Sequence, residues 1–222
     1  MKMRAKLAGD PPGIDAPAAS APRKRRDAPI DALIAIGSST GGIDALHVIL
    51  SAFPADCPPT LVVQHISGPF SVSFAKGLAG SCRARVQLAE EAAPLLPGHI
   101  YIAGGNSHHL TVSSGSKPIC RLQAGPPIAG HRPSIDALFR SCAAFGPAVR
   151  AALLTGMGRD GAEGLLEIRN QGGRTCAQNA ETSLVFGMAR VALGLGAVEA
   201  LLPLERIAAA LIRPHTRKAE AT

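Results

Sequence analysis

The sequence predicts an α/β fold, a doubly wound and mostly parallel sheet with helices on both faces and a small antiparallel hairpin excursion. Two observations support this prediction. Short apolar runs alternate with segments whose apolar residues recur at helical spacing, as in strand–helix–strand units. The stretch 100–123 differs, because it contains short strands joined by a turn, and we expect it to form the antiparallel excursion.

Short apolar runs predict the strands. The first run ends at Gly37 and the second leads into Gln64 and His65, and both have the length and composition of buried strands. The turn 113–116, which is rich in Ser and contains Gly, predicts a hairpin between two later runs. The predicted strands cover 33–36, 61–63, 100–103, 109–112, 119–122, 149–154 and 174–177.

Segments with apolar residues at helical spacing predict the helices. Ser134 is suited to cap the N-terminus of one of them. The negative charge of Asp136 in the first turn would interact favourably with the positive end of the helix dipole. Gly77 and Gly80 weaken another, because glycine disfavours a helix interior. Pro203 stands where a helix begins. The predicted helices cover 43–53, 70–78, 134–144, 162–170 and 204–212.

The charge distribution separates a central domain from two basic tails. Residues 1–29 contain seven Lys and Arg against three Asp and Glu, a net charge of +4. Residues 213–222 carry +2, from three basic residues and one acidic residue, and residues 30–212 carry +1, from 13 and 12. We therefore predict a disordered basic tail over 1–29, one folded domain over 30–212 and a C-terminal tail over 213–222.

The composition argues against a nucleic-acid partner. Most of the net charge of +7 lies in the tails, and aromatic residues make up only 3% of the chain, with no Trp to stack on bases. Two interpretations of the basic tail stay open, a solvated segment and an electrostatic tether to an acidic partner or an anionic membrane surface.

Cysteine usage and hydropathy indicate the compartment. The five cysteines are odd in number and widely spaced, which fits reduced thiols and gives no signal for a metal site. No apolar run is long enough to span a bilayer, and the N-terminus lacks the apolar core of a secretory signal. We expect a cytoplasmic protein without a bound metal and without membrane insertion.

The first predicted strand leads into a glycine-rich serine motif. Residues 37–41 fit the pattern G-x-S-x-G around Ser39, in which glycines permit a tight turn that exposes the serine hydroxyl and places backbone N–H groups near an oxyanion. Two other interpretations are a plain glycine-rich turn and a phosphate-binding loop. Nucleotide binding is the weaker one, because the chain lacks GKS, GKT and G-x-G-x-x-G at this turn.

His65 and Asp160 each follow another predicted strand. The ends of neighbouring parallel strands lie about 5 Å apart, so His65 can meet the hydroxyl of Ser39. Asp160 would orient the imidazole and stabilise its charged form. Taken singly, His65 also fits a structural role and Asp160 a turn or a helix cap. Together the three residues predict a catalytic triad, whose order along the chain differs from that of α/β-hydrolases.

Several segments together resemble the signature sequences of chemotaxis protein-glutamate methylesterases of the CheB type. The resemblance covers roughly residues 31–212, and its ordered series is far more specific than any one motif. It identifies 30–212 as a methylesterase catalytic domain. The segments are IAIGSSTGG at 34–42, VQH at 63–65, LPGHIYIA at 96–103, GPP at 125–127, HRPSID at 131–136, LTGMGRDGA at 154–162 and AQN at 177–179.

The resemblance implies a cofactor-free serine hydrolase on a doubly wound sheet. The implied substrate is a glutamate γ-methyl ester in the cytoplasmic helical region of a methyl-accepting chemoreceptor, which yields methanol, and some family members also deamidate glutamine. By position in the motifs, Ser39 is the nucleophile, His65 the general base and Asp160 the orienting carboxylate. We also expect N–H groups near Thr40 and Met157 to bind the oxyanion.

The chain departs from the family pattern in several places. Family members usually carry an N-terminal phosphorylatable receiver domain, whereas 29 tail residues stand there. We therefore expect constitutive activity, control by a separate regulatory protein, or a place in a chemosensory-like pathway that does not control swimming. Ser38 replaces an expected alanine, which leaves a second hydroxyl beside the nucleophile. Ala189 replaces an expected proline, and Asn106 replaces an expected aspartate.

Other polar residues are weaker candidates. Arg132 and Arg190 can pair with a carboxylate on the substrate, and an ion pair that anchors a loop is the equal alternative. His131 is placed to reach the mouth of the site. His108 and His109 point to opposite faces of a strand, which favours packing or surface roles over metal binding. Three functions compete with the methylesterase: hydrolysis of another ester or amide, a non-catalytic binding module of a chemosensory pathway, and nucleotide binding at the serine motif.

Overall fold

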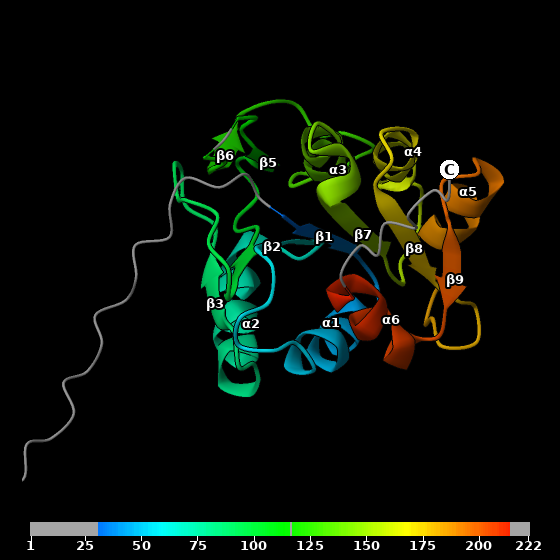
Figure 1. Ribbon diagram of the computed structural model, residues 1–222, viewed down its shortest axis with the longest axis horizontal. Helices are drawn as coiled ribbons and strands as arrows, with labels where there is room; N and C mark the ends of the chain where they lie inside the picture. Colours follow the sequence, from blue (N-terminus) through cyan, green and yellow to red (C-terminus); the bar gives the residue numbers. More distant parts are fainter. Residues whose placement is uncertain (1–30, 116, 214–222) are drawn as a thin grey trace, which may run out of the picture.

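A seven-stranded parallel sheet forms the centre of the fold (Figure 1). The computed structural model describes residues 31–115 and 117–213, so the predicted tail 1–29 and nearly all of the predicted tail 213–222 lie outside the described residues. The strand order is β3-β4-β2-β1-β7-β8-β9, which confirms the predicted parallel α/β sheet. The strands are β1 (Leu33–Ser38), β2 (Thr60–Gln64), β3 (Arg85–Leu88), β4 (His99–Ile102), β7 (Val149–Leu153), β8 (Arg174–Gln178) and β9 (Ala200–Leu202).

Helices cover both faces of this sheet (Figure 1). One face carries α1 (Gly42–Ser51), α2 (Gly68–Ser81) and α6 (Leu204–Ile212), and the other carries α3 (Ile135–Ala143), α4 (Ala162–Asn170) and α5 (Met188–Gly194). Within β1, Ile34 and Ile36 pack against the first group, whereas Leu33 and Ala35 pack against the second. Burial on both faces explains why the central strands are continuous apolar runs rather than alternating ones.

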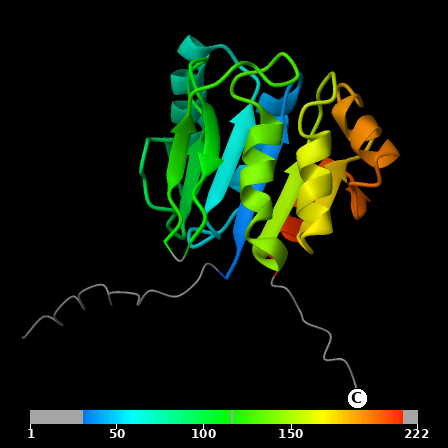
Figure 2. The same ribbon diagram turned by 90° about the horizontal axis from the view of Figure 1, so that it is seen from above.

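An antiparallel hairpin of β5 (His109–Val112) and β6 (Cys120–Gln123) lies beside α3 (Figure 2). This pair confirms the predicted hairpin. The prediction that 100–103 belongs to the antiparallel excursion is wrong, because β4 pairs in parallel with β2 and β3. Ile100 packs into the core on one face of the sheet and Tyr101 into the core on the other, as an internal strand of a parallel sheet requires.

Two strands and one helix were not predicted. β3 and β9 are the edge strands, four and three residues long, and most of their residues are only partly buried, so their apolar signal is weak. α5 has seven residues, too few to show helical periodicity. The predicted helix at 70–78 is confirmed as the longer α2, which continues through Gly77 and Gly80.

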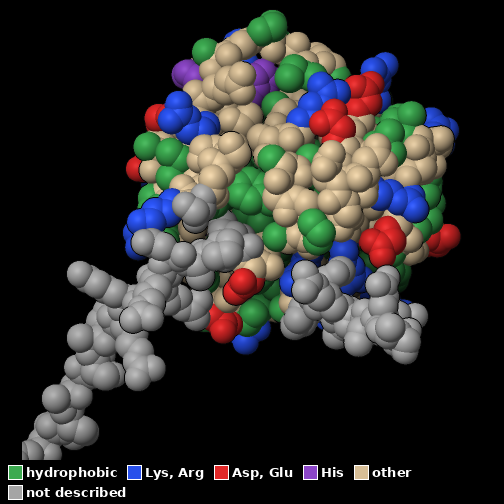
Figure 3. Space-filling model, turned by 45° about the horizontal axis from the view of Figure 1, so that its top comes forward, with side chains coloured by type: hydrophobic (Ala, Val, Ile, Leu, Met, Phe, Trp, Pro, Cys, Tyr) green, Lys and Arg blue, Asp and Glu red, His purple; other side chains and the backbone are tan. Residues whose placement is uncertain are grey.

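Within the described ranges, no helix has both the length and the apolar character needed to cross a membrane. On the face shown in Figure 3, Lys and Arg side chains are interspersed with Asp and Glu side chains. The net charge of +1 between residues 30 and 212 agrees with this mixture. This face therefore lacks a large patch of one charge, and it would attract a charged partner through individual side chains.

The close packing of α3 on α4 depends on Gly164. A Cβ added there would lie 2.7 Å from Cβ of Phe139 and 3.1 Å from the carbonyl oxygen of Asp136. We expect Gly164→Ala to lower the free energy of unfolding by about 1–3 kcal/mol, because the two helices must move apart. Urea unfolding followed by circular dichroism measures this change.

Gly77→Ala in α2 is the matched control, since it makes the same chemical change at an open helical position. We expect it to raise the free energy of unfolding by about 0.5–1 kcal/mol, because alanine favours the helix. Equal destabilisation by both substitutions would show that helix separation is not the cause.

Candidate active site

The carboxyl ends of three neighbouring strands bring the predicted triad residues to one edge of the sheet. β1 pairs in parallel with β2 and β7, and the register places Ser38 beside Gln64. The next residues, Ser39 and His65, therefore lie side by side, and the amide of His65 donates to the carbonyl oxygen of Ser38 at 3.0 Å. Asp160 reaches the same edge from the loop that follows β7.

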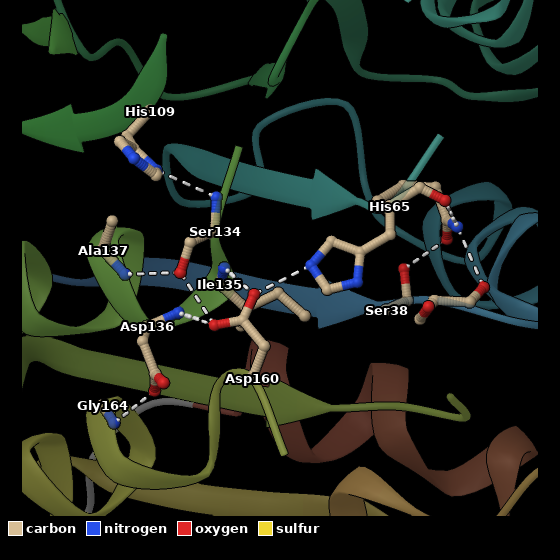
Figure 4. Close-up of polar contacts among 11 residues, drawn as sticks. Ser38, His65, His109, Ser134, Ile135, Asp136, Ala137, Asp160 and Gly164 are labelled. Carbon is tan, nitrogen blue, oxygen red and sulfur yellow. Dashed lines mark hydrogen bonds and ion pairs between the residues drawn. The ribbon is translucent and has the colours of Figure 1, made fainter. Parts of the chain in front are cut away.

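His65 and Asp160 form a buried hydrogen bond. Nε2 of His65 lies 2.8 Å from Oδ2 of Asp160, and the two side chains are 8% and 1% exposed. The other ring nitrogen, Nδ1, is buried and has no hydrogen-bond partner among the described residues. Figure 4 shows one ring nitrogen directed at Asp160 and the other toward the end of β1, where Ser38 is drawn. Because Nε2 donates to the carboxylate, Nδ1 carries the free lone pair that can accept a proton.

The start of α3 holds the carboxylate of Asp160. Oδ1 accepts hydrogen bonds from the hydroxyl of Ser134 at 2.7 Å and the amide of Asp136 at 3.0 Å, and Oδ2 accepts from the amide of Ile135 at 2.8 Å. Burial raises the pKa of Asp160, but the bond from His65 and these donors outweigh burial and hold the pKa below its usual range. Asp160 is therefore a charged partner for His65 at neutral pH.

A second layer of hydrogen bonds fixes the start of α3 (Figure 4). Nδ1 of His109 accepts from the amide of Ser134 at 3.1 Å, and Nε2 donates to the carbonyl oxygen of Pro126 at 3.0 Å. The carboxylate of Asp136 accepts from the amide of Gly164 at 2.7 Å, which ties α3 to α4. His109 thus has a packing role, in agreement with the preference stated from the sequence.

The two serines of the motif lie in different environments. Ser38 is fully buried, and its hydroxyl donates to Oε1 of Gln64 at 2.7 Å. Nε2 of Gln64 donates to the carbonyl oxygens of Ser39 at 2.9 Å and His65 at 3.0 Å. Ser39 is only partly buried, and within the part of the chain that the structure describes no hydrogen bond joins its hydroxyl to His65. The environments favour Ser39 as the nucleophile, and its bond to His65 stays a prediction.

The predicted oxyanion site lies next to Ser39. A Cβ added to Gly156 would lie 2.6 Å from Cβ of Ser39, so the serine side chain packs against the backbone just before Met157. In residues 31–115 and 117–213, no hydrogen bond uses the amide of Thr40 or of Met157. The side chain of Met157 is 72% exposed. Free N–H groups here agree with the predicted role of both amides, which stays a prediction.

A cavity of about 390 Å³ opens beside His65, and its lining includes Ser67, Asn106 and Arg132. The ring of His131, which also lines it, stacks on the ring of His65 with centroids 3.7 Å apart and 8° between the planes. The sequence placed His131 near the mouth of the site, but no sequence signal indicated the stack. The cavity gives a small molecule or peptide access to the imidazole of His65.

The two arginines predicted to contact substrate differ in their surroundings. Nε of Arg132 donates to the carbonyl oxygen of Asn106 and Nη1 to that of Gly125, both at 2.6 Å. Arg132 thus anchors the loop through backbone carbonyls rather than through an ion pair. Arg190 is exposed near the start of α5 and has no ion pair among the described residues. Contact with substrate stays a prediction for both.

The hydrogen bonds to Asp160 predict a pH-dependent contribution to stability. Because the pKa of Asp160 is lower in the folded protein than in the unfolded chain, this contribution is complete above about pH 5 and is lost as the pH falls through the folded pKa. We expect Asp160→Asn to lower the free energy of unfolding by roughly 2–4 kcal/mol at pH 7, because a side-chain amide, with one acceptor oxygen, would face four donors. The deficit should shrink toward about pH 3. Urea unfolding across this range measures it, and a deficit that does not change with pH would contradict the explanation.

Comparison with known proteins identifies relatives with similar sequences. A protein-glutamate methylesterase/protein-glutamine glutaminase 1 of Rhizobium johnstonii is 49% identical over 191 residues, which cover 86% of this chain and 55% of that protein. A protein of the same name from Caulobacter vibrioides is 46% identical over 195 residues, which cover 87% of this chain and 57% of that protein. The chain therefore spans about half the length of these relatives.

A solved structure and a family model agree with these relatives. The crystal structure of the Thermotoga maritima CheB methylesterase catalytic domain matches with a TM-score of 0.79 and 34% identity, covering 82% of this chain and 97% of that one. The family model described as CheB methylesterase matches residues 34–211. The predicted resemblance is thus confirmed, and the chain belongs to the CheB methylesterase family.

Proposed function

We propose that this chain is a serine esterase that hydrolyses glutamate γ-methyl esters in the cytoplasmic helical region of a methyl-accepting chemoreceptor and releases methanol. The observation that carries the proposal is the buried hydrogen bond of 2.8 Å between His65 and Asp160, which leaves Nδ1 of His65 unpaired at the strand end beside Ser39. The names of the relatives supply the substrate class. The proposed place of action is the cytoplasm, where that part of a receptor lies.

In the proposed first step, the hydroxyl of Ser39 attacks the ester carbonyl while Nδ1 of His65 takes its proton. The new bond joins the serine oxygen to the carbonyl carbon, and an electron pair moves onto the carbonyl oxygen. The amides of Thr40 and Met157 stabilise that oxyanion. The bond to the methoxy oxygen then breaks, and the proton on Nδ1 passes to this oxygen, so methanol leaves and a γ-glutamyl ester of Ser39 remains.

In the proposed second step, water takes the place of methanol. Nδ1 of His65 removes a proton from the water as its oxygen attacks the acyl carbon. The bond to Ser39 breaks, and the proton returns to the serine oxygen. The products are the regenerated enzyme and the glutamate carboxylic acid, which releases its proton to solvent and becomes the carboxylate.

Asp160 contributes through charge and orientation. Its hydrogen bond fixes the proton on Nε2 of His65, so only Nδ1 can accept the proton of Ser39. Its negative charge stabilises the imidazolium that forms in both steps. Gln64 links the carbonyl groups of the nucleophile and the base through one amide group, so the two residues keep a constant separation.

A second candidate reaction is deamidation of glutamine, because the names of the relatives also include protein-glutamine glutaminase. The same attack on an amide yields ammonia, which leaves only after it receives a proton, and Nδ1 of His65 holds that proton at the right stage. Hydrolysis of a different ester or amide on the same residues is the remaining alternative. Control by a separate regulatory protein stays a prediction.

Methanol release from a methylated cytoplasmic receptor fragment tests the proposal. We expect wild type and Ser38→Ala to release methanol, whereas Ser39→Ala should lose at least about 10³-fold in kcat. Ser38→Ala removes one buried hydrogen bond to Gln64, so its loss should be about tenfold or less. Circular dichroism and thermal unfolding check that each variant is folded.

The outcomes test the identity of the nucleophile and the identity of the substrate separately. Release by Ser39→Ala at the wild-type rate would exclude Ser39 as the nucleophile. If wild type hydrolyses small esters but releases no methanol from several methylated receptor fragments, the proposed roles of the catalytic residues would stand. The receptor would then be rejected as the substrate.

A further inference from the structure

The stack of His131 on His65 has no role in the steps proposed above, yet a tight turn holds it in place. His131 ends a two-residue hairpin turn, in which Ile128 and His131 exchange backbone hydrogen bonds of 3.0 and 2.9 Å. Both central residues have positive φ, 49° at Ala129 and 84° at Gly130, as in a type I′ turn. The turn is thus formed by backbone geometry and sets the direction of the His131 side chain.

Two features show that this turn is firmly placed. Ala129 adopts a left-handed conformation that residues with a Cβ rarely take, which indicates that the surrounding structure imposes it. On the other side of His131, the guanidinium of Arg132 is held by the carbonyl oxygens of Asn106 and Gly125. His131 is therefore braced by the residues before and after it, and its ring has little freedom to leave the ring of His65.

A ring over His65 matters because His65 becomes charged in the proposed reaction. Asp160 lies at the ring edge, through Nε2, and His131 covers a face. A neutral aromatic ring on that face attracts the imidazolium and shields it from water, whereas a second imidazolium would repel it. The side chain of His65 is only 8% exposed. The stack therefore favours the charged intermediate only while His131 is neutral.

The surroundings of His131 keep it neutral. Burial lowers the pKa of His131, the charge of His65 lowers it further, and Asp160 opposes both effects. Among the described residues, the titratable or charged groups that face His131 are His65 from the end of β2, Asp160 from the loop after β7, and Arg132 next to it in the cavity wall. Two of these three carry or acquire positive charge.

We propose that His131 is a positioning residue, whose neutral ring holds His65 with Nε2 at Asp160 and Nδ1 at Ser39, and whose protonation stops turnover. This proposal rests on the proposed esterase function. The segment 131–134 would then orient His65, in addition to anchoring the loop and lining the cavity.

Kinetics of two variants test the proposal, with methanol release from the methylated receptor fragment as the readout between about pH 5.5 and pH 9. His131→Ala removes the ring, and we expect kcat to fall by about 10–100-fold while KM changes by less than about threefold. His131→Phe keeps a stacking ring without a titratable group, and it should recover most of this loss. In wild type, protonation of His131 should add its own loss of kcat at low pH, so log kcat should fall more steeply there in wild type than in His131→Phe, which lacks this group.

His108→Ala is the matched control, because His108 bonds to Ser107 and does not line the cavity. It should leave kcat and the acid limb unchanged. Wild-type kcat in His131→Ala would overturn the proposal, as would a loss confined to KM, which would mark a substrate contact. An acid limb with the same slope in wild type and His131→Phe would overturn the effect of protonation.

An NMR titration of the histidine rings tests the stack without any substrate. In His65→Phe, a ring still covers His131 but its charge is gone, so the pKa of His131 should rise relative to wild type. An unchanged pKa of His131 would overturn the coupling of the two rings. A raised pKa of His131 in His65→Phe, together with no methanol release by wild type, would support the stack and reject the proposed function, so the two failures are distinguishable.

Discussion

The buried charge of Asp160 determines how this edge of the sheet is built. A carboxylate that is 1% exposed loses nearly all its hydration, so its free energy depends on the hydrogen bonds that replace water. Three of its four donors come from the start of α3, and two of these are backbone amides of the first turn. Since these amides point along the helix axis, the carboxylate fixes both the position and the direction of α3.

Other parts of the fold then keep α3 in that place. Gly164 lets α4 approach closely, and its amide donates to Asp136. The hairpin contributes through His109, whose Nδ1 accepts from Ser134 and whose Nε2 donates to Pro126. Only one neutral tautomer of His109 satisfies both bonds. The antiparallel hairpin of β5 and β6 therefore helps to hold the site in place through His109.

The carboxyl groups of Asp136 and Asp160, which meet at the start of α3, have pKa values that are shifted in opposite directions. Burial raises the pKa of Asp136, and the charge of Asp160 raises it further. Together they outweigh the hydrogen bonds from the amides of Gly164 and Gly161 and the charge of Arg140, which lower it. As the pH falls, Asp136 takes up a proton before Asp160 does. The carboxylate of Asp160 thus keeps its charge over a wider range of pH than that of Asp136.

The sequence was sufficient to predict the central strands and the location of the three proposed catalytic residues. Buried parallel strands are continuous apolar runs, and functional residues follow their carboxyl ends, so Ser39, His65 and Asp160 were predicted at one edge. The edge strands β3 and β9 were not, because partly buried short segments lack a distinct apolar pattern. Likewise, a local pattern cannot show which nitrogen of His65 faces Asp160, since that depends on contacts between distant segments.

The same limit applies to His131 and Ser38. The stack requires a type I′ turn that contains Ala129, and propensity alone would not place an alanine there. The commitment of the Ser38 hydroxyl to Gln64 depends on the pairing of β1 with β2, which sets the two side chains next to each other. Both observations depend on contacts between segments far apart in the sequence, whereas the motifs were local.

The donors around Asp160 have one more consequence for the proposed chemistry. They lower its pKa, so the carboxylate is a weak base despite its burial. When His65 takes the proton of Ser39, the proton on Nε2 therefore stays on the ring instead of passing to Asp160, and His65 carries a full positive charge. That charge makes Nδ1 an acid strong enough to deliver its proton to the leaving oxygen. In the proposed reaction, the helix start that binds Asp160 would thus promote departure of methanol without touching the substrate.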